Sequence, residues 1–175
     1  MRTAPRLTPL LTADEIQAGV RRLALEIDAA YPPGTVLLLL TVLKGGFVFL
    51  ADLIRAMPRP VMLDFIVLSS YAGSDTSGRV RLVKDMDANI RGRDVVIVED
   101  IVDTGLTLAY LRRELAAREP HSLRTVCLLD KPARRRVTLH IEHVGFTIED
   151  RFVVGYGLDL NECYRELPYI ASVED

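Results

Sequence analysis

Several signatures that would assign a small chain to a familiar class are absent from this sequence. Its two cysteines, Cys127 and Cys163, show no CxxC or Cys/His spacing typical of zinc sites, so buried or semi-buried free thiols are expected. No apolar run approaches the roughly 20 residues that cross a bilayer, and the N-terminus has no signal-peptide core. These absences predict a soluble cytoplasmic protein with no membrane partner.

A surplus of positive charge is also lacking. Lys and Arg number 22 against 24 Asp and Glu, which leaves a net charge of -2. A protein that neutralises phosphates along a duplex carries a basic excess, so nucleic acid is not an expected partner. The two common phosphate loops are missing as well, because no GxxxxGK[ST] occurs and no GxGxxG follows a predicted strand. A phosphate-binding site in this chain must therefore be formed by a different sequence pattern.

The apolar residues that are present predict alternating strands and helices. A capping box at Thr12–Glu15 begins a helix that runs to about Ile27, and helical spacing recurs from Phe47 and from Leu108. Apolar runs predict strands at residues 36–43, 61–69, 81–86, 95–98, 123–129, 144–148 and 152–154. With 49% hydrophobic residues the chain can bury one substantial core. The alternation predicts an α/β fold with a mainly parallel central sheet and helices on both faces.

One stretch, VVIVEDIVDTGLT from Val95 to Thr107, places polar groups at the end of a predicted strand. Glu99 and Asp100 follow the apolar run, and the turn Asp103-Thr104-Gly105 leads into a helix, where ligands and anions tend to bind. Carboxylates suit Mg²⁺ or ribose hydroxyls, and the turn suits a phosphate monoester, so a phosphorylated sugar would satisfy both. The spacing alone also allows a simpler interpretation, in which the turn caps the helix and the acid pair is solvated.

This stretch closely resembles the 5-phosphoribosyl-1-pyrophosphate (PRPP) signature of type I phosphoribosyltransferases. LKGG at Leu43–Gly46, Ser70-Tyr71, DKP at Asp130–Pro132 and the block Phe152–Ile170 resemble, in order, the blocks of hypoxanthine-guanine phosphoribosyltransferases. The resemblance implies one domain over residues 1–175 with the type I fold, a small hood from the N-terminal segment and about 150–175, and a flexible lid loop at about 70–81. It also implies purine salvage: phosphoribose passes from PRPP to N9 of hypoxanthine and/or guanine, giving IMP or GMP and pyrophosphate, with Mg²⁺ required.

Roles for individual residues follow from the same resemblance. Glu99 and Asp100 would hold the ribose hydroxyls of PRPP and, with Asp159, Mg²⁺. Asp103 would be the catalytic proton-transfer group near N7 of the purine. The 5′-phosphate would be cradled by Asp103, Thr104, Gly105, Leu106 and Thr107, and the pyrophosphate would face Lys44, Gly45 and Arg165. Some family members carry a basic or polar residue where this chain has Leu106.

The purine would be recognised by residues outside the acidic stretch. Lys131 would donate to O6, Phe152 would stack on the base, the backbone of Val153 would meet its Watson–Crick edge, and Asp159 would lie near its exocyclic position. Ser70 and Tyr71 would contact pyrophosphate when the lid closes and excludes water. The Leu43–Lys44 bond, often cis in the family, is a further prediction to inspect.

Three other interpretations stay open at this point. The chain could be a PRPP-fold regulator that binds nucleotide and RNA, a structural subunit with a degenerate site, or a phosphoribosyltransferase that prefers xanthine or another base. The basic run Arg134–Arg136 has no assigned role, and a solvated face or subunit contact is expected for it. Because related enzymes are dimers or tetramers, a homodimer or homotetramer is expected, with the LKGG region near the interface.

Overall fold

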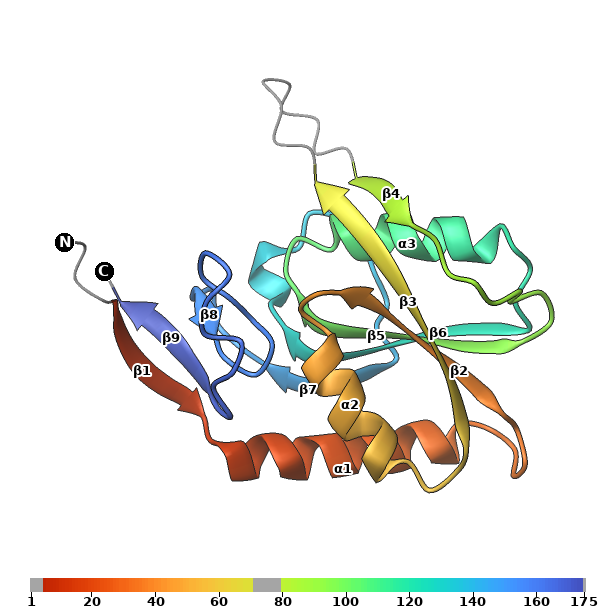
Figure 1. Cartoon of the computed structure of the whole chain (residues 1–175), viewed down its shortest axis with the longest axis horizontal. Helices are drawn as coiled ribbons and strands as arrows, with labels where there is room; N and C mark the ends of the chain where they lie inside the picture. The colour runs from red at the N-terminus through yellow and green to blue at the C-terminus, as the bar shows by residue number, and fades with distance from the viewer. Residues whose placement is uncertain (1–4, 71–79, 175) are drawn as a thin grey trace.

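The computed structural model describes residues 5–70 and 80–174. Its main sheet has six strands in the order β4-β3-β2-β5-β6-β7 (Figure 1). The strands are β2 (Leu37–Leu43), β3 (Val61–Ser70), β4 (Val80–Lys84), β5 (Asp94–Val102), β6 (Ser122–Asp130) and β7 (His143–Thr147). Every neighbouring pair is parallel except β3 and β4. The predicted mainly parallel sheet is therefore confirmed.

Helices cover both faces of this sheet, as predicted. They are α1 (Ala13–Ala29), α2 (Phe47–Ala56), α3 (Leu106–Ala116) and the short 3-10 helix η1 (Pro132–Arg134). The capping box at the start of α1 is present: the Glu15 N–H donates to the Thr12 hydroxyl, and the Thr12 N–H donates to the Glu15 carboxylate. Two apolar layers result, one between the sheet and the α1–α2 pair and one between the sheet and α3.

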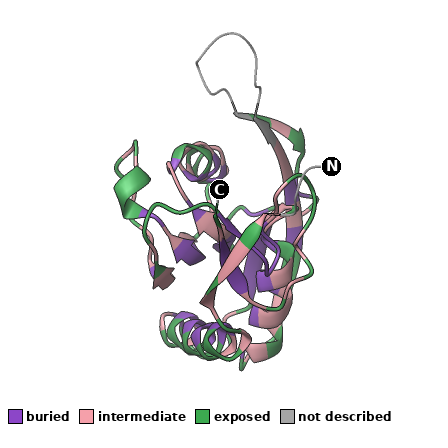
Figure 2. Cartoon of the chain, turned by 90° about the vertical axis from the view of Figure 1, so that its left-hand side faces the viewer, coloured by how far each residue is buried: buried purple, intermediate pink, exposed green. Residues whose placement is uncertain are grey.

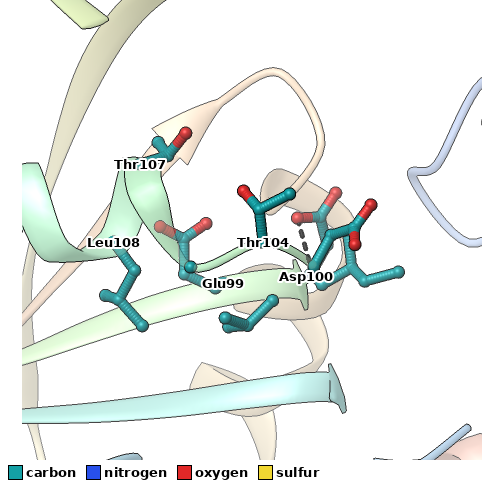
Figure 3. A pocket seen from close by; sticks show the side chains of 9 residues that line it. Glu99, Asp100, Thr104, Thr107 and Leu108 are labelled. Carbon is teal, nitrogen blue, oxygen red and sulfur yellow. Dashed lines mark hydrogen bonds between the residues drawn. The ribbon is translucent and has the colours of Figure 1, made fainter. Parts of the chain in front are cut away.

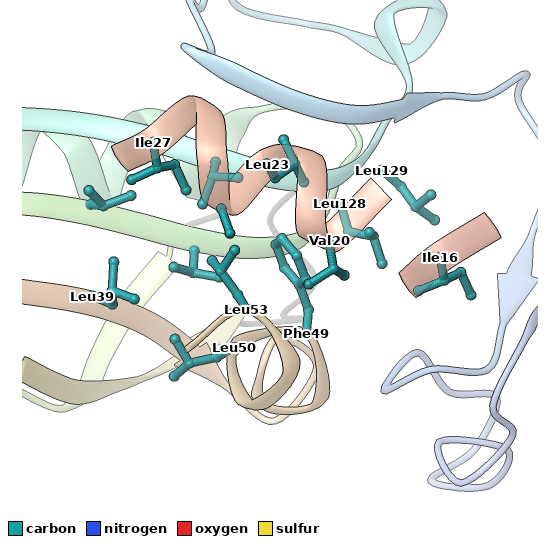
Figure 4. Close-up of a cluster of buried hydrophobic side chains, with 14 of the residues drawn as sticks. Ile16, Val20, Leu23, Ile27, Leu39, Phe49, Leu50, Leu53, Leu128 and Leu129 are labelled. Atoms are coloured by element: carbon teal, nitrogen blue, oxygen red, sulfur yellow. The ribbon is translucent and has the colours of Figure 1, made fainter. Parts of the chain in front are cut away.

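The α1–α2 layer is the larger core (Figure 4). Leu23 and Ile27 of α1 and Phe49 of α2 are fully buried against Leu39 of β2 and Leu128 of β6. Figure 2 shows the buried positions gathered on the sheet and on the inward sides of the helices. Because this packing sits under the middle of the sheet, the carboxyl ends of the strands are held in fixed positions.

A second, three-stranded sheet forms the expected hood, at the left of Figure 1. It is antiparallel, in the order β1-β9-β8, and joins β1 (Arg6–Leu11), β8 (Val153–Val154) and β9 (Ile170–Glu174). The apolar pattern did not predict β1 or β9. Each is short and is stabilised by hydrogen bonds to a strand at the opposite end of the chain, so no local period marks it.

Several predicted boundaries were wrong. The central strand continues past the acid pair to Val102, because β6 keeps pairing with it as far as Asp130. Ser70 is the last residue of β3 and residues 80–81 begin β4, so strand pairing includes both ends of the segment predicted as the lid at about 70–81. Tyr71 lies outside the described residues.

The two cysteines have different environments. Both are free; Cys127 is buried in β6, as expected, whereas Cys163 is exposed, so the prediction of burial was wrong for it. Among the residues described, no helix combines the length and apolar character that a membrane crossing requires.

Candidate active site

Many of the predicted site residues line one cavity between the carboxyl ends of the central strands and the hood. Its volume is about 580 Å³, and its lining includes Lys44, Asp100, Asp103, Lys131, Phe152 and Arg165. These side chains come from five separate segments of the sequence. A smaller pocket of about 230 Å³ adjoins it and is lined by residues 99–105 with Thr107 and Leu108 (Figure 3). Asp100 and Asp103 line both spaces.

Glu99 and Asp100, the acid pair of β5, are shielded from solvent to different degrees, since Glu99 is buried and Asp100 is half-buried. Glu99 is only 8% exposed, and its Oε1 atom has no hydrogen-bond partner among the described residues. Burial, reinforced by the neighbouring Asp100 charge, raises the pKa of Glu99 well above its usual range. Burial likewise raises the pKa of Asp100 to about 6, although the Ile101 N–H donates to its Oδ1 at 2.8 Å and Arg165 adds a positive charge nearby. A fully solvated acid pair is therefore ruled out, and within residues 5–70 and 80–174 neither carboxylate has a cationic partner in direct contact.

The turn after β5 leaves the start of α3 open. Gly105 is the N-cap, with φ of 81°, and it makes no side-chain cap hydrogen bond. A Cβ atom at this position would lie 2.7 Å from Leu139 Cδ1, so glycine is required both by backbone conformation and by space. Asp103 does not cap the helix, and the Thr104 hydroxyl accepts only a 3.4 Å bond from the Leu106 N–H. The first-turn N–H groups beside the smaller pocket are thus suited to an anion.

Leu106 is placed differently from the rest of the predicted cradle. Its side chain is 38% exposed, and it is not among the residues that line either space. Thr107, one residue later, does line the smaller pocket, and Figure 3 shows its hydroxyl beside Glu99 and Thr104. Any contact of Leu106 with a ligand here would be through its backbone.

The LKGG loop passes close to the acid pair. The Leu43–Lys44 peptide bond is cis, as the resemblance predicted. A Cβ atom on Gly45 would lie 1.9 Å from Asp100 Oδ2, and one on Gly157 would lie 2.4 Å from the Gly45 carbonyl oxygen. The loop therefore fits between β5 and the hood only because two positions lack a side chain.

Two cations face the cavity from this side and share a carboxylate. Lys44 Nζ lies 2.8 Å from Glu162 Oε2, and Arg165 Nη2 lies 3.4 Å from the same oxygen. Arg165 also contacts Asp159 Oδ1 at 2.8 Å and donates to the Gly157 carbonyl at 2.7 Å. The contact with Lys44, and then that with Arg165, lowers the pKa of Glu162. Sequence reasoning missed Glu162, because nothing in the pattern around it distinguishes it from a surface acid.

Lys131, Phe152 and Val153, which the resemblance predicts to recognise the purine, also line the cavity. Lys131 is 5% exposed, and its ammonium donates to the Arg151 carbonyl, so it is not an ordinary solvated lysine. Phe152 is 55% exposed and lines the cavity, whereas the adjacent Val153 is 6% exposed. An aromatic face that is open at a cavity, next to a buried ammonium, suits a flat heterocycle with a carbonyl oxygen.

Known proteins are similar to this chain over nearly its whole length. The model of the phosphoribosyl transferase domain matches residues 9–161. The hypoxanthine-guanine phosphoribosyltransferase of Mycobacterium avium is 52% identical over 171 residues, 94% of this chain and 84% of that protein. The hypoxanthine phosphoribosyltransferase of Salmonella typhimurium is 47% identical over 161 residues, 91% of this chain and 90% of that protein. The chain belongs to the hypoxanthine-guanine phosphoribosyltransferase family.

The fold of this phosphoribosyltransferase agrees with that assignment. A crystal structure of a hypoxanthine-guanine phosphoribosyltransferase from Bacillus anthracis, with a HEPES molecule in its active site, superposes with a TM-score of 0.92. The two are 46% identical, and the match covers 98% of this chain and 100% of that one. A hypoxanthine phosphoribosyltransferase from Staphylococcus aureus gives 0.90 at 40% identity, over 95% of this chain and 91% of that one. The predicted type I fold and enzyme class are confirmed.

The basic run of this phosphoribosyltransferase lies against the acidic turn. Arg135 is half-buried there, so the expectation of a solvated face was wrong for it, whereas Arg134 and Arg136 are exposed. Arg135 pairs with Asp130, and its Nη1 donates to the Asp103 carbonyl at 3.0 Å. Arg134 Nε lies 2.8 Å from Asp103 Oδ1, and Arg134 Nη1 lies 3.3 Å from Asp150 Oδ1. These contacts connect sequence-distant residues, and no spacing rule could have indicated them.

A preassembled metal centre is not found in the described part of this phosphoribosyltransferase, where no group of three or more His, Cys, Asp or Glu side chains is arranged to hold an ion. Asp159, one of the predicted metal ligands, is paired with Arg165 instead. Glu99 presents a buried carboxylate to the smaller pocket, and the half-buried Asp100 lines both spaces. A hard cation bound here would need further oxygens from a ligand or from water.

Proposed function

We propose that this enzyme transfers the phosphoribosyl group of PRPP to N9 of hypoxanthine and/or guanine, giving IMP or GMP and pyrophosphate. The observation that carries the proposal is the shared cavity, which brings Asp100 and Asp103 of the acidic stretch together with Lys131 and Phe152. A sugar phosphate fits the first pair and a 6-oxopurine fits the second. The reacting atoms, C1′ of PRPP and N9 of the base, would meet between them.

The PRPP half of the site would use the smaller pocket. Glu99 and Asp100 supply carboxylate oxygens for the ribose hydroxyls, and the unpartnered Oε1 of Glu99 is suited to accept a hydrogen bond there. The 5′-phosphate would lie on the turn from Asp103 to Thr107, where α3 begins and the Thr104 and Thr107 hydroxyls are near. The helix dipole and free N–H groups favour this dianion.

Mg²⁺ fits the carboxylates present. Mg²⁺ is commonly bound through one or two carboxylates plus substrate phosphates and water, so Asp100 and Glu99 would hold it together with oxygens of PRPP. Asp159 would take part only after its contact with Arg165 changes. When bound, the metal would neutralise charge on the departing pyrophosphate.

The pyrophosphate would face the cations on the hood side. Lys44, the Gly45 backbone and Arg165 line the cavity within reach of the acid pair. Ser70 and Tyr71 are proposed, by resemblance, to contact it from the lid. Glu162 contacts both Lys44 and Arg165, so pyrophosphate would replace an anion that the chain itself supplies.

The base half would select 6-oxopurines. The Lys131 ammonium donates to a backbone carbonyl here and has further protons for the purine O6, while the exposed Phe152 ring offers a stacking surface. Val153 and Asp159 would meet the Watson–Crick edge and the exocyclic position. An amino group at C6 would bring donors toward the ammonium and would be rejected.

The reaction would proceed through a ribosyl cation. The bond from C1′ to the pyrophosphate oxygen breaks as N9 bonds to C1′, and the N7 proton passes to the Asp103 carboxylate. The Glu99 and Asp100 carboxylates beneath the ribose would stabilise the positive charge that develops on the sugar ring. Exclusion of water from the cavity would keep that cation from hydrolysis.

The direct test is a substrate panel with PRPP and Mg²⁺, in which pyrophosphate release is followed with hypoxanthine, guanine, xanthine and adenine. We expect turnover of hypoxanthine, guanine or both, and loss of 6-oxo over 6-amino discrimination in Lys131→Ala. Turnover of adenine alone, or of no base, would defeat the proposal. Preference for xanthine would establish the neighbouring alternative. Asp103→Asn should lower kcat, and an undiminished rate would show that Asp103 does not move the proton.

A regulator that binds RNA is less well supported by this structure. Such a protein needs an available basic face, yet Arg134 and Arg135 of the basic run are both paired with carboxylates of the chain. The expected homodimer or homotetramer stays a prediction, which sedimentation of the purified protein would check. The exposed Phe47 next to the LKGG loop is consistent with a contact there.

A further inference from the structure

Arg134 occupies a junction between three parts of the cavity wall. It ends η1, three residues after Lys131, and residues i and i+3 of a 3-10 helix lie on the same side. Both side chains reach the segment that leads into the hood: Lys131 donates to the Arg151 carbonyl, and Arg134 Nη1 lies 3.3 Å from Asp150 Oδ1. That segment continues directly into Phe152. One turn of η1 therefore holds the base-stacking segment at two points.

The same guanidinium also reaches the acidic turn. Arg134 Nε lies 2.8 Å from Asp103 Oδ1, an oxygen that is buried and accepts no hydrogen bond within the described residues. The contact joins opposite charges, and Asp103 still lines both spaces of the cavity. A guanidinium remains charged at every physiological pH and can serve two carboxylates at once because its donors form a planar fork.

Neighbouring arginines do not duplicate this arrangement. Arg135 fixes the backbone of the turn through the Asp103 carbonyl, and Arg136 contributes its backbone N–H to the Thr104 carbonyl. Only Arg134, among the described residues, contacts the Asp103 carboxylate. The side chain of Asp103 and the segment before Phe152 thus share one cationic partner.

We propose that Arg134 is a positioning residue, which holds the Asp103 carboxylate and the Phe152 segment at the spacing that a bound purine needs. The proposal rests on the proposed function, in which Asp103 meets N7 and Phe152 stacks on the same base. A purine is rigid, so a change in the distance between these two contacts cannot be absorbed by the ligand. Loss of Arg134 should therefore weaken binding and reaction of the purine. It should affect binding of PRPP far less, because the proposed phosphate site is formed mainly by backbone groups.

The test compares Arg134→Gln with Arg136→Gln, which removes an equal charge from the same run. We expect Arg134→Gln to lower kcat/KM for the purine about tenfold, as small misplacements of reacting groups do, with KM for PRPP changed less than about twofold. Arg136→Gln should change neither constant. Arg134→Lys keeps a charge near Asp103 and should recover part of the loss. Melting temperatures of the three variants within about 2 °C of the wild type would show that folding is not the cause.

Equal effects of Arg134→Gln and Arg136→Gln on kcat/KM for the purine would overturn the proposal. A rise in kcat/KM for Arg134→Gln would also overturn it, because it would mean that Arg134 restrains Asp103 rather than positions it. If Arg134→Gln does not fold, Asp150→Asn removes only the partner on the hood segment and should give a smaller loss in the same constant, whereas no change would count against the proposal. A wild-type protein that turns over no base would instead defeat the proposed function.

Discussion

Replacing Asp100 by Asn should make the ligand-free protein more stable while it disables the site. Burial raises the pKa of this carboxyl from about 3.8 to about 6, which means that the folded protein binds its proton more tightly than the unfolded chain does. The stabilising contribution is complete below the unfolded pKa and is lost as pH rises through about 6. Above pH 7 the ionised group costs up to about 3 kcal/mol of unfolding free energy.

The substitution removes this cost because Asn carries no charge and its side-chain oxygen can still accept the Ile101 N–H. At pH 8 we expect an increase of up to about 3 kcal/mol, or roughly 6 to 10 °C in melting temperature for a chain of this length. At pH 4 the two proteins should be nearly equal. Relief of repulsion on Glu99, whose pKa is also raised, acts in the same direction.

Urea denaturation at several pH values between 4 and 8, in protein freed of divalent cations by a chelator, measures the effect. The difference between variant and wild type is the quantity to plot, because burial lowers the pKa of His143 and gives a slope of opposite sign near pH 6 in both proteins. Asp87→Asn, which removes a charge from a side chain that is 91% exposed, is the control for charge alone. A difference that does not grow with pH, or a variant less stable than wild type at pH 8, would refute the reasoning.

Three further predictions follow from the geometry. Gly45→Ala should lower kcat/KM for PRPP more than about tenfold, because the added Cβ would lie 1.9 Å from Asp100 Oδ2 and the loop must move; an unchanged value in steady-state kinetics would contradict this. Glu162→Gln should tighten binding of magnesium pyrophosphate about threefold in calorimetry, since it frees Lys44 and leaves Arg165 paired with Asp159 alone, whereas the nearby Glu166→Gln should not. Phe49→Ala should cost about 3 to 5 kcal/mol in urea denaturation, because the ring is fully buried in the larger core; a loss below 1 kcal/mol would show that the layer repacks freely.

Local pattern was sufficient for most of the fold. The strand β2 and the second half of β6 are buried and largely apolar, which makes them visible without a partner. The start of α1 was predicted to the residue because its capping box is a short-range interaction. The hood strands β1 and β9 were missed by pattern, since each forms only when the two ends of the chain meet.

The acidic stretch shows where the sequence alone was informative about the site. Its carboxylates, glycine and threonines stand in consecutive positions, and a strand followed by a helix places them together in any α/β sheet. Lys131 and Phe152 were assigned to the same site by resemblance. The fold places both of them on the wall of one cavity. The lid prediction could not be followed, because most of it lies outside the described residues.

The order of the elements and the chemical kinds of groups at the strand ends can be predicted from the sequence, because both depend on neighbours within a few residues. Which charged side chains form ion pairs is established only by the tertiary structure. Glu162 lies against Lys44, and Arg134 lies against Asp103 and Asp150, although each pair is far apart in the chain. The burial that shifts the pKa of Asp100 likewise arises from elements packed around it. Electrostatic contacts act through space and have no period along the chain, so folding alone establishes them.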